Sequence, residues 1–140
     1  MCSTAEHCQS EMLKKLRDWE IPEEDQASIM QFLVSERYVD DARYARAYAR
    51  EKHLYAGWGP RKIEQGLKLK RIGANDIDDA LAEVSFDDFV ESLRRIIASK
   101  RRSVKASSDY ERNGKLIRFA MSRGFTYDQI KCCLDVSDDF

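Results

Sequence analysis

The sequence predicts an all-α protein, and its composition and apolar periodicity both support this fold class. Helix-forming residues dominate the 140-residue chain, which has two prolines, six glycines and no run of β-branched residues. Apolar residues make up 43% of the chain, which is enough for a packed core. They recur at i and i+4 in successive segments, as expected for helices that each bury one face.

The apolar pattern also repeats along the chain. A shift of 53 residues aligns residues 62–67 with residues 115–120. Further along, the same shift pairs Ile72 with Phe125, Ile77 with Ile130, and Leu81 with Leu134. A shift of 51 residues pairs Met12 with Ile63, Leu16 with Leu67, and Ile21 with Ile72. Each copy predicts a helix, a tight turn that ends in an apolar residue, and a second helix, so the chain contains structural repeats.

In the first part of the chain we expect three helices, over residues 10–19, 22–37 and about 41–55. Pro22 suits a first helical turn, and the acids that follow it favour the positive end of the helix dipole. Asp40 or Asp41 caps the third helix. The segment 57–60, Gly-Trp-Gly-Pro, breaks the chain after it.

Five more helices are expected after this break. Pro60 opens one that runs to about residue 71, and Asn75 caps a short one that runs to about residue 84. Ser85 or Asp87 caps a long basic helix that ends near residue 102, and a polar linker follows over residues 103–108. The last two helices span residues 109–122, with Gly124 at the C-terminal cap, and residues from Thr126 to about Val136.

These helices group into three repeats, each of three helices. The predicted boundaries are residues 1–39, 40–85 and 86–140, and the first repeat lacks most of its first helix, of which residues 2–8 resemble the end. Repeats of this kind pack against their neighbours and form elongated, curved arrays. We therefore expect one continuous repeat domain. We also expect the protein to be a monomer.

The net charge of −1 conceals alternating acidic and basic blocks. Residues 43–71 carry nine bases and two acids, and residues 94–123 carry ten bases and two acids. Between them, residues 72–93 carry seven acids and no base. Solvated helix faces account for part of this pattern, but two large basic blocks in an acidic protein favour an anionic partner.

No group of residues predicts catalysis or a cofactor. The sequence has no GxxxxGK or GxGxxG phosphate loop, and His7 and His53 are its only histidines. Neighbouring acids such as Asp78 and Asp79 fall near predicted helix starts, where capping and the helix dipole explain them. The chain therefore looks like a binding protein rather than an enzyme.

The cysteines predict neither a metal site nor a disulfide framework. Cys2, Cys8, Cys132 and Cys133 lack the spacing of a zinc knuckle and the pattern of a secreted scaffold. The sequence has no apolar run long enough to span a membrane and no signal peptide. We expect a cytoplasmic protein with reduced thiols and no metal.

Three segments resemble the RecX regulatory proteins. Residues 33–45, Leu-Val-Ser-Glu-Arg-Tyr-Val-Asp-Asp-Ala-Arg-Tyr-Ala, are similar to the family's junction of two acids followed by an aromatic residue and alanine. Residues 59–72 resemble its second motif, and residues 115–134, with Arg-Gly-Phe at 123–125, resemble its closing motif. Two positions depart from the pattern. Gly66 replaces a glutamate and should weaken its helix by about 1 kcal/mol relative to alanine, and Arg71 replaces the usual glycine before a turn.

The resemblance implies a helical protein of three repeats that binds RecA on single-stranded DNA. Such proteins lie in the filament groove or block filament growth, which reduces ATP hydrolysis, strand exchange and SOS coprotease activity. A basic face of a repeat protein could meet the acidic surface of the partner or exposed phosphate. From charge and expected exposure, the candidate binding residues are Arg43, Arg46, Arg50, Arg61, Lys62, Arg94, Arg95, Arg101 and Arg102.

Spacing within the third helix separates binding from packing residues. Arg43, Arg46 and Arg50 share one face, whereas Tyr44 and Tyr48 share another and are interpreted as packing. Two other hypotheses stay open. One is a helical protein that binds DNA directly without RecA. The other is a general helical scaffold for protein partners.

Overall fold

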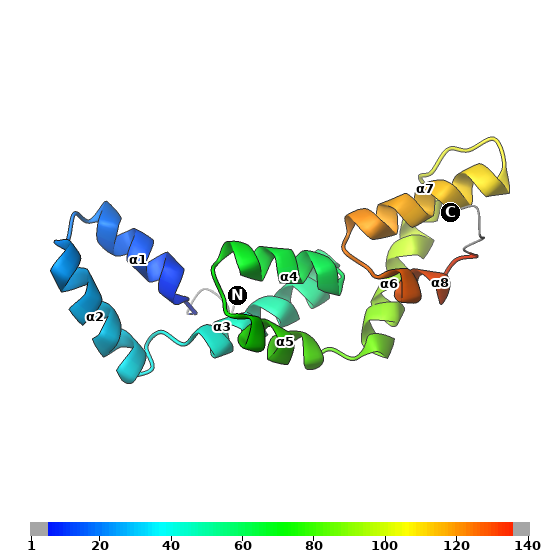
Figure 1. The fold of residues 1–140 in the computed structure, drawn as a ribbon. Coiled ribbons are helices and arrows are strands. Elements are labelled where there is room, and N and C mark those ends of the chain that lie inside the picture. Colours follow the sequence, from blue (N-terminus) through cyan, green and yellow to red (C-terminus); the bar gives the residue numbers. More distant parts are fainter. Residues whose placement is uncertain (1–5, 136–140) are drawn as a thin grey trace. The chain divides into compact units, whose positions relative to one another are not determined.

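The structure is a computed structural model that describes residues 6–135, and all regular secondary structure in this range is helical (Figure 1). The all-α prediction is therefore confirmed. The elements in chain order are α1 (Gln9–Asp18), α2 (Glu23–Ser35), α3 (Asp41–Glu51), the π-helical segment η2 (Lys52–Ala56), α4 (Pro60–Leu69), α5 (Ala74–Ala82), α6 (Phe86–Arg101), α7 (Asp109–Ser122) and α8 (Tyr127–Lys131).

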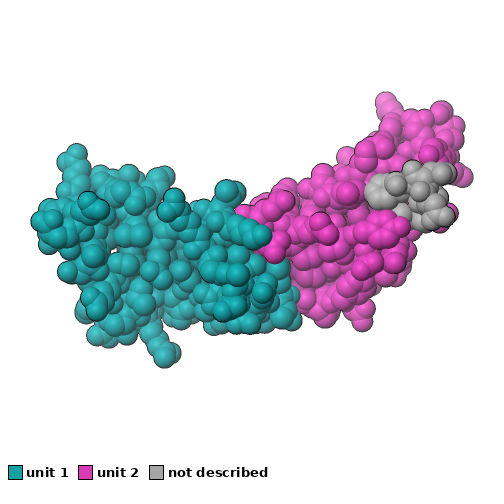
Figure 2. All heavy atoms as spheres, in the orientation of Figure 1, with its two compact units in different colours: residues 1–49, 66–83 teal, residues 50–65, 84–140 magenta. Residues whose placement is uncertain are grey.

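The helices pack into two compact units that interleave along the chain (Figure 2). In the described range, unit 1 comprises residues 6–49 and 66–83, and unit 2 comprises residues 50–65 and 84–135. Helices α3 and α4 thus contribute to both units. Because this division follows packing rather than sequence similarity, the repeat boundaries at residues 39/40 and 85/86 stay a prediction.

The helix starts follow the capping residues of the sequence at most positions. Asp40 caps α3, because its Oδ1 accepts a hydrogen bond from the Arg43 N–H at 3.0 Å. Ser85 caps α6 by accepting from the Asp88 N–H at 3.0 Å. Thr126 caps α8 with a capping box in which the Gln129 side chain accepts from the Thr126 N–H.

Several helix boundaries differ from the prediction, most of them by one or two residues at a helix end, and three of the differences have a specific physical reason. Helix α5 begins after Gly73 rather than after Asn75, since glycine is also a favourable N-cap residue. The helix predicted to reach residue 55 changes to a π-helical turn at Lys52. Helix α8 ends at Lys131 rather than near Val136, because Cys132 and Cys133 are weak helix formers and the Asn113 side chain donates to the Asp135 carbonyl.

The expected remnant of an earlier helix is only partly covered by the structure. Residues 6–8 belong to no helix, and the backbone of Cys8 is extended, so this part of the prediction is wrong. The Cys8 N–H is turned toward the Glu11 carboxylate, which fixes it as a cap of α1 instead. Residues 2–5 lie outside the described residues, as does Val136.

The predicted repeat recurs in the backbone itself. Glu20, Arg71 and Gly124 occupy matching positions after α1, α4 and α7, and all have positive φ, at 59°, 60° and 92°. In each copy the next residue donates its N–H to the carbonyl five positions back, at 3.1 to 3.2 Å. This turn is the left-handed helix ending that glycine usually supplies, so Arg71 adopts the conformation of the glycine it replaces.

Most of the paired apolar positions are buried in each copy, whereas Met12, Ile21 and Leu81 are only partly buried. Leu16, Leu67 and Ala120 are all buried, as are Ile72 and Phe125 in the turns that follow. The further pairs Ile63 with Leu116 and Ile77 with Ile130 are buried too. The internal repeat read from the sequence is therefore confirmed by the cores of both units.

A packing contact explains why residue 66, in the interior of a helix, is glycine. A Cβ atom at this position would lie 2.0 Å from the hydroxyl oxygen of Tyr48, which packs across the α4 backbone within unit 1. Glycine at this position makes the helix less stable, but it allows the aromatic ring of Tyr48 to approach the backbone closely. Tyr44 and Tyr48 stack with ring centroids 6.0 Å apart, as the packing interpretation of these tyrosines predicts.

Unit 2 joins the start of α4 to the end of α7, and we call this contact the α4–α7 joint. The Gly59 N–H donates to the Arg123 carbonyl at 2.7 Å, and the Arg61 N–H donates to the Gly124 carbonyl at 2.9 Å. Unpaired donors of a helix start thus meet unpaired acceptors of a helix end. Side chains do not fit here, because a Cβ at Gly59 would lie 2.5 Å from the backbone of Gly124.

Unit 1 repeats this arrangement with different chemistry. The α1–α4 joint brings the start of α1 to the end of α4, where the Ser10 hydroxyl donates to the Lys70 carbonyl at 2.6 Å. Cys8 and Ser10 correspond to Gly59 and Arg61 by the shift of 51 residues, and Lys70 corresponds to Arg123 by the shift of 53. The same joint is therefore built twice, once through a side chain and once through the main chain.

We predict that Gly124→Ala lowers the free energy of unfolding by about 2 kcal/mol or more. Its φ is 92°, and a Cβ atom would lie 2.4 Å from the backbone nitrogen and Cβ of Lys62. Gly114→Ala within α7 is the matched control, because Gly114 has no positive φ and a Cβ there would meet only the end of the flexible Arg118 side chain, at 3.5 Å. Urea denaturation followed by circular dichroism measures both variants, and equal losses would contradict the joint.

Candidate partner-binding surfaces

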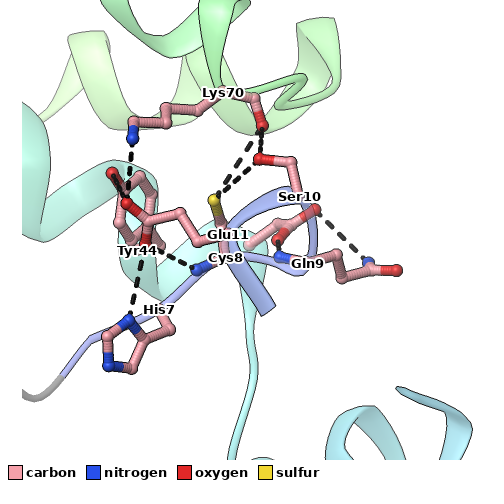
Figure 3. Close-up of polar contacts among 8 residues, drawn as sticks. His7, Cys8, Gln9, Ser10, Glu11, Tyr44 and Lys70 are labelled. Atoms are coloured by element: carbon pink, nitrogen blue, oxygen red, sulfur yellow. Dashed lines mark hydrogen bonds and ion pairs between the residues drawn. The ribbon is translucent and has the colours of Figure 1, made fainter. Parts of the chain in front are cut away.

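The α1–α4 joint is organised around the Glu11 carboxylate (Figure 3). Its Oε2 accepts from the Lys70 ammonium at 3.0 Å and from the Tyr44 hydroxyl at 3.4 Å, and its Oε1 lies 3.5 Å from His7 Nδ1. One carboxylate therefore connects α1 to α3 and α4. This cluster holds α1 in place against α3 and the end of α4.

The pKa values in this cluster report a mutually stabilised ion pair. Burial by itself raises the pKa of Glu11, but the hydrogen bond and charge of Lys70, the Cys8 N–H and His7 outweigh burial and lower it. The hydrogen bond to Glu11 raises the pKa of Lys70, although burial opposes this. Burial and the neighbouring Glu11 charge raise the pKa of Tyr44 well above its usual range. The pair is ionised at neutral pH.

Two of the predicted binding residues lie in unit 1 and already have partners. Arg43 Nε donates to Glu6 Oε1 at 2.7 Å, and its guanidinium also donates to the Arg37 carbonyl at 3.0 Å. Arg46 Nε lies 3.4 Å from Glu83 Oε2. Because both side chains are about 40% exposed, each can still reach an external anion beside its internal one.

The other seven predicted residues lie in unit 2, in three separate places. Arg50 and Arg61 are exposed, at the end of α3 and the start of α4. The Lys62 ammonium lies 4.7 Å from the centroid of the Trp58 ring, a cation–π distance that favours a packing role for its stem. The remaining four are on the exposed side of α6 or at its end: Arg94, Arg95, Arg101 and Arg102.

Within unit 2, α6 and η2 border a hollow of about 510 Å³ whose charged lining side chains are all basic. We call it the basic hollow. Three cations line it, Arg95 and Lys100 from α6 and Arg123 from the turn after α7. Ser92, Ser99 and Ser103 line it as well, and its apolar lining comes from Leu54, Tyr55, Ile96 and Phe119. The arrangement can bind an anionic group beside an apolar one.

Two of these cations are fixed in position by their neighbours. Arg123 Nη1 donates to the Ala56 carbonyl at the end of η2, at 3.0 Å, and its guanidinium lies 5.1 Å from the Phe119 ring. The Lys100 ammonium lies 4.8 Å from the centroid of the same ring. Arg95 is 68% exposed and lies 3.9 Å from Glu91, at the limit of an exposed i, i+4 pair.

His53 lies at the edge of the basic hollow without adding charge to it. Its ring packs edge-on against Phe89 with centroids 5.1 Å apart, and its buried Nδ1 has no hydrogen-bond partner within the described range. Burial lowers the pKa of His53; Asp88 opposes this, and Arg95 lowers it further. The imidazole is therefore neutral at pH 7.

A second hollow of about 1030 Å³ lies beside α7 but has mixed charge. Arg101, Arg112 and Arg118 line it together with Asp109, Glu111 and Asp135. Arg112 is paired to Asp109 at 2.8 Å, so opposite charges are already compensated there. This hollow offers less attraction for an anion than the basic hollow does.

The four arginines predicted on or near α6 therefore differ in their surroundings. Arg94, Arg101 and Arg102 do not line the basic hollow, whereas Arg95 does. Sequence reasoning missed Lys100 and Arg123. Arg123 belongs to the Arg-Gly-Phe turn, so this motif could have drawn attention to it in the sequence. Its position in the lining of the hollow, however, depends on the packing of η2 against α6 and α7.

Residues 6–135 contain neither a cluster of metal-binding side chains nor a helix suited to a membrane. In this range no three histidine, cysteine or acidic side chains gather as metal ligands. Cys8 is buried against the end of α4, Cys132 is exposed, and Cys133 is partly buried, with burial raising the pKa of its thiol. No helix in the described part of the chain is both long enough and apolar enough to cross a membrane.

Comparison with protein families places this architecture among known domains. The family model described as the second three-helix domain of RecX matches residues 40–81, and that of the third three-helix domain matches residues 87–134. A regulatory protein RecX from Vibrio campbellii is 35% identical over 139 residues. That match covers 99% of this chain and 88% of the relative.

Solved structures show the same likeness. A crystal structure of a regulatory protein RecX superimposes with a TM-score of 0.86 and 27% identity over 91% of this chain. This chain spans 64% of that protein, which is less than two thirds of its length. A crystal structure of RecX from Lactobacillus salivarius gives a TM-score of 0.82 with 26% identity, and covers 91% of this chain and 83% of that one.

The Glu11–Lys70 pair gives a pH-dependent prediction. Because folding lowers the pKa of Glu11, its contribution is present above the unfolded-state pKa and is lost as the pH falls through the folded-state pKa. Glu11→Gln should therefore cost about 0.5–1 kcal/mol of unfolding free energy at pH 7 and much less at strongly acidic pH. Urea denaturation across this pH range measures it, with the exposed Glu36→Gln as control. A pH-independent difference would contradict the ionic origin.

Proposed function

Because this chain belongs to the RecX family of regulatory proteins, we propose that it binds RecA filaments on single-stranded DNA and restrains them without catalysing a reaction. The single observation that carries this proposal is the match of consecutive RecX three-helix domains to residues 40–81 and 87–134. The proposed partner assembles on DNA, so we place the protein in the cytoplasm.

The charge distribution supports an anionic partner surface. The two basic blocks of the sequence fall on α3 and α4 and on α6 and α7. Exposed arginines of these helices have long, flexible side chains that can meet carboxylates or phosphates in bidentate geometry. We propose that the nine basic residues selected from the sequence contribute to this surface, with Arg43 held in position by two internal hydrogen bonds.

Binding alone is sufficient for regulation. A protein that binds one state of a filament more tightly than another shifts the population toward that state, whatever the chemistry of the filament. The proposed mechanism therefore needs no catalytic group, no cofactor and no metal in this chain. It needs a rigid binding surface, which the buried cores and the two helix joints supply.

Direct binding to DNA is the second candidate, favoured by the excess of bases over acids in residues 43–71 and 94–123. Phosphate contacts would then supply most of the affinity, with a steep dependence on salt. A general protein scaffold is the third, for which the described surface offers no specific observation.

We predict that this protein lowers the single-stranded-DNA-dependent ATPase rate of RecA from the same organism at less than one copy per RecA. The reason is that one bound molecule would affect many filament subunits. The rate of ATP hydrolysis during titration measures it. No change at equal stoichiometry would contradict filament regulation, and recovery of the rate on adding excess single-stranded DNA would indicate DNA sequestration instead.

We also predict that charge reversal on α3, Arg46→Glu with Arg50→Glu, raises the concentration needed for half-inhibition about tenfold. The reversed charges would repel the acidic surface that the arginines are proposed to meet. The matched control is Lys14→Glu with Arg17→Glu, two exposed bases of α1 outside the predicted set. Circular dichroism establishes folding of each variant, and equal loss in both would remove Arg46 and Arg50 from the site.

A further inference from the structure

The basic hollow has an unusual lining for a surface of an overall acidic protein. Arg95, Lys100 and Arg123 line it, and no aspartate or glutamate does. Neighbouring like charges repel one another in the free protein, so an anion that enters gains attraction from all three. His53 is kept neutral by burial and adds neither attraction nor repulsion at neutral pH.

The rim of the same hollow is apolar and exposed. Leu54 is 58% exposed and Tyr55 is 82% exposed, although both are large side chains next to a buried core. Both belong to η2, and π-helical turns of this kind occur frequently at functional sites. Tyrosine and arginine side by side are also the residue types that dominate the energy of protein–protein interfaces.

The hollow is built before any ligand arrives. The hydrogen bond from Arg123 Nη1 to the Ala56 carbonyl ties the turn after α7 to the end of η2. Gly57, with φ at 68°, ends η2 and lets it approach α6, since a Cβ there would lie 3.0 Å from Ile96 Cδ1. A preformed site loses less entropy on binding than one that must order its side chains.

We propose that the basic hollow binds an acidic peptide segment in which an aspartate or glutamate stands next to a large apolar residue. The carboxylate lies between Arg95, Lys100 and Arg123, and the apolar side chain packs on Leu54 and Tyr55. This inference deepens the proposed function and rests on it only for the owner of the segment, which would be the filament protein. The binding chemistry itself concerns this chain alone.

A peptide fits the hollow better than a nucleic acid does. Single-stranded nucleic acid is bound along a charged groove with several aromatic side chains on which successive bases stack. Here Tyr55 is the one strongly exposed aromatic side chain of the lining, and aliphatic Leu54 stands beside it. Aliphatic contact next to a localised positive charge suits a side chain of leucine type adjoining a carboxylate.

The experiment is an NMR titration of the ¹⁵N-labelled chain without RecA. The probes are a short peptide with a leucine flanked by glutamates, the same peptide with alanine in place of leucine, and an oligothymidylate of equal net charge. The hollow variant is Arg95→Glu with Lys100→Glu. The matched control is Lys105→Glu with Arg118→Glu, which reverses two exposed charges of unit 2 that lie outside the hollow and outside the nine predicted binding residues.

We expect the leucine peptide to shift the amide signals of Ser99 and Ser103 and to bind more tightly than the alanine peptide. The hollow variant should bind it about tenfold more weakly, and the control variant should bind it as the wild type does. Absence of peptide binding, or equal loss in both variants, overturns the proposal. Tighter binding of the oligothymidylate, lost in the hollow variant, overturns it in favour of nucleic acid.

These outcomes are separate from the test of the proposed function. If the wild type restrains the RecA ATPase but the peptide does not bind, only the assignment of the hollow fails. If the peptide binds as expected but RecA is unaffected, the acidic partner is another protein and the proposed function fails.

Discussion

The structure depends on a joint in which the start of one helix meets the end of another. In unit 2 the N–H groups of Gly59 and Arg61 donate to the carbonyls of Arg123 and Gly124. Both helix ends have backbone groups without partners inside their own helices, and the joint pairs them with each other. It also aligns the positive end of the α4 dipole with the negative end of the α7 dipole, which is electrostatically favourable. The requirement for two glycines follows from the short distance between these backbones.

The same joint in unit 1 shows how one architecture tolerates different residues. There the Ser10 hydroxyl takes the place of a main-chain donor, and the Lys70 carbonyl accepts its hydrogen bond. The longer approach leaves room for side chains, and Glu11, Lys70 and Tyr44 fill it with a partly buried polar cluster. Such a cluster stabilises the fold only while its carboxylate is ionised. The main-chain joint of unit 2 contains no titratable group in its hydrogen bonds, so acid does not protonate it.

Regulation by this protein would depend on basic side chains that the packing of the helices holds in fixed positions. The α4–α7 joint fixes the turn that carries Arg123, and the guanidinium of Arg123 in turn holds the end of η2. The basic hollow is therefore a direct consequence of the joint rather than an independent surface feature. Exposed arginines elsewhere on α6 have the same charge but lack the apolar rim. The combination of three cations with Leu54 and Tyr55 sets the basic hollow apart from surfaces that attract anions by charge alone.

The sequence by itself determined the helical fold class, the internal repeat and most helix starts, because apolar periodicity and capping residues act within a few positions along the chain. It also indicated the family through motifs that supply the turns and the joints. The sequence did not reveal why Gly66 replaces a better helix former, since its reason is the ring of Tyr48 from another helix. Nor did it distinguish Arg95 from Arg94, or select Lys100 and Arg123. Those choices depend on which side chains converge around η2, and convergence is decided only when residues far apart in the chain pack together.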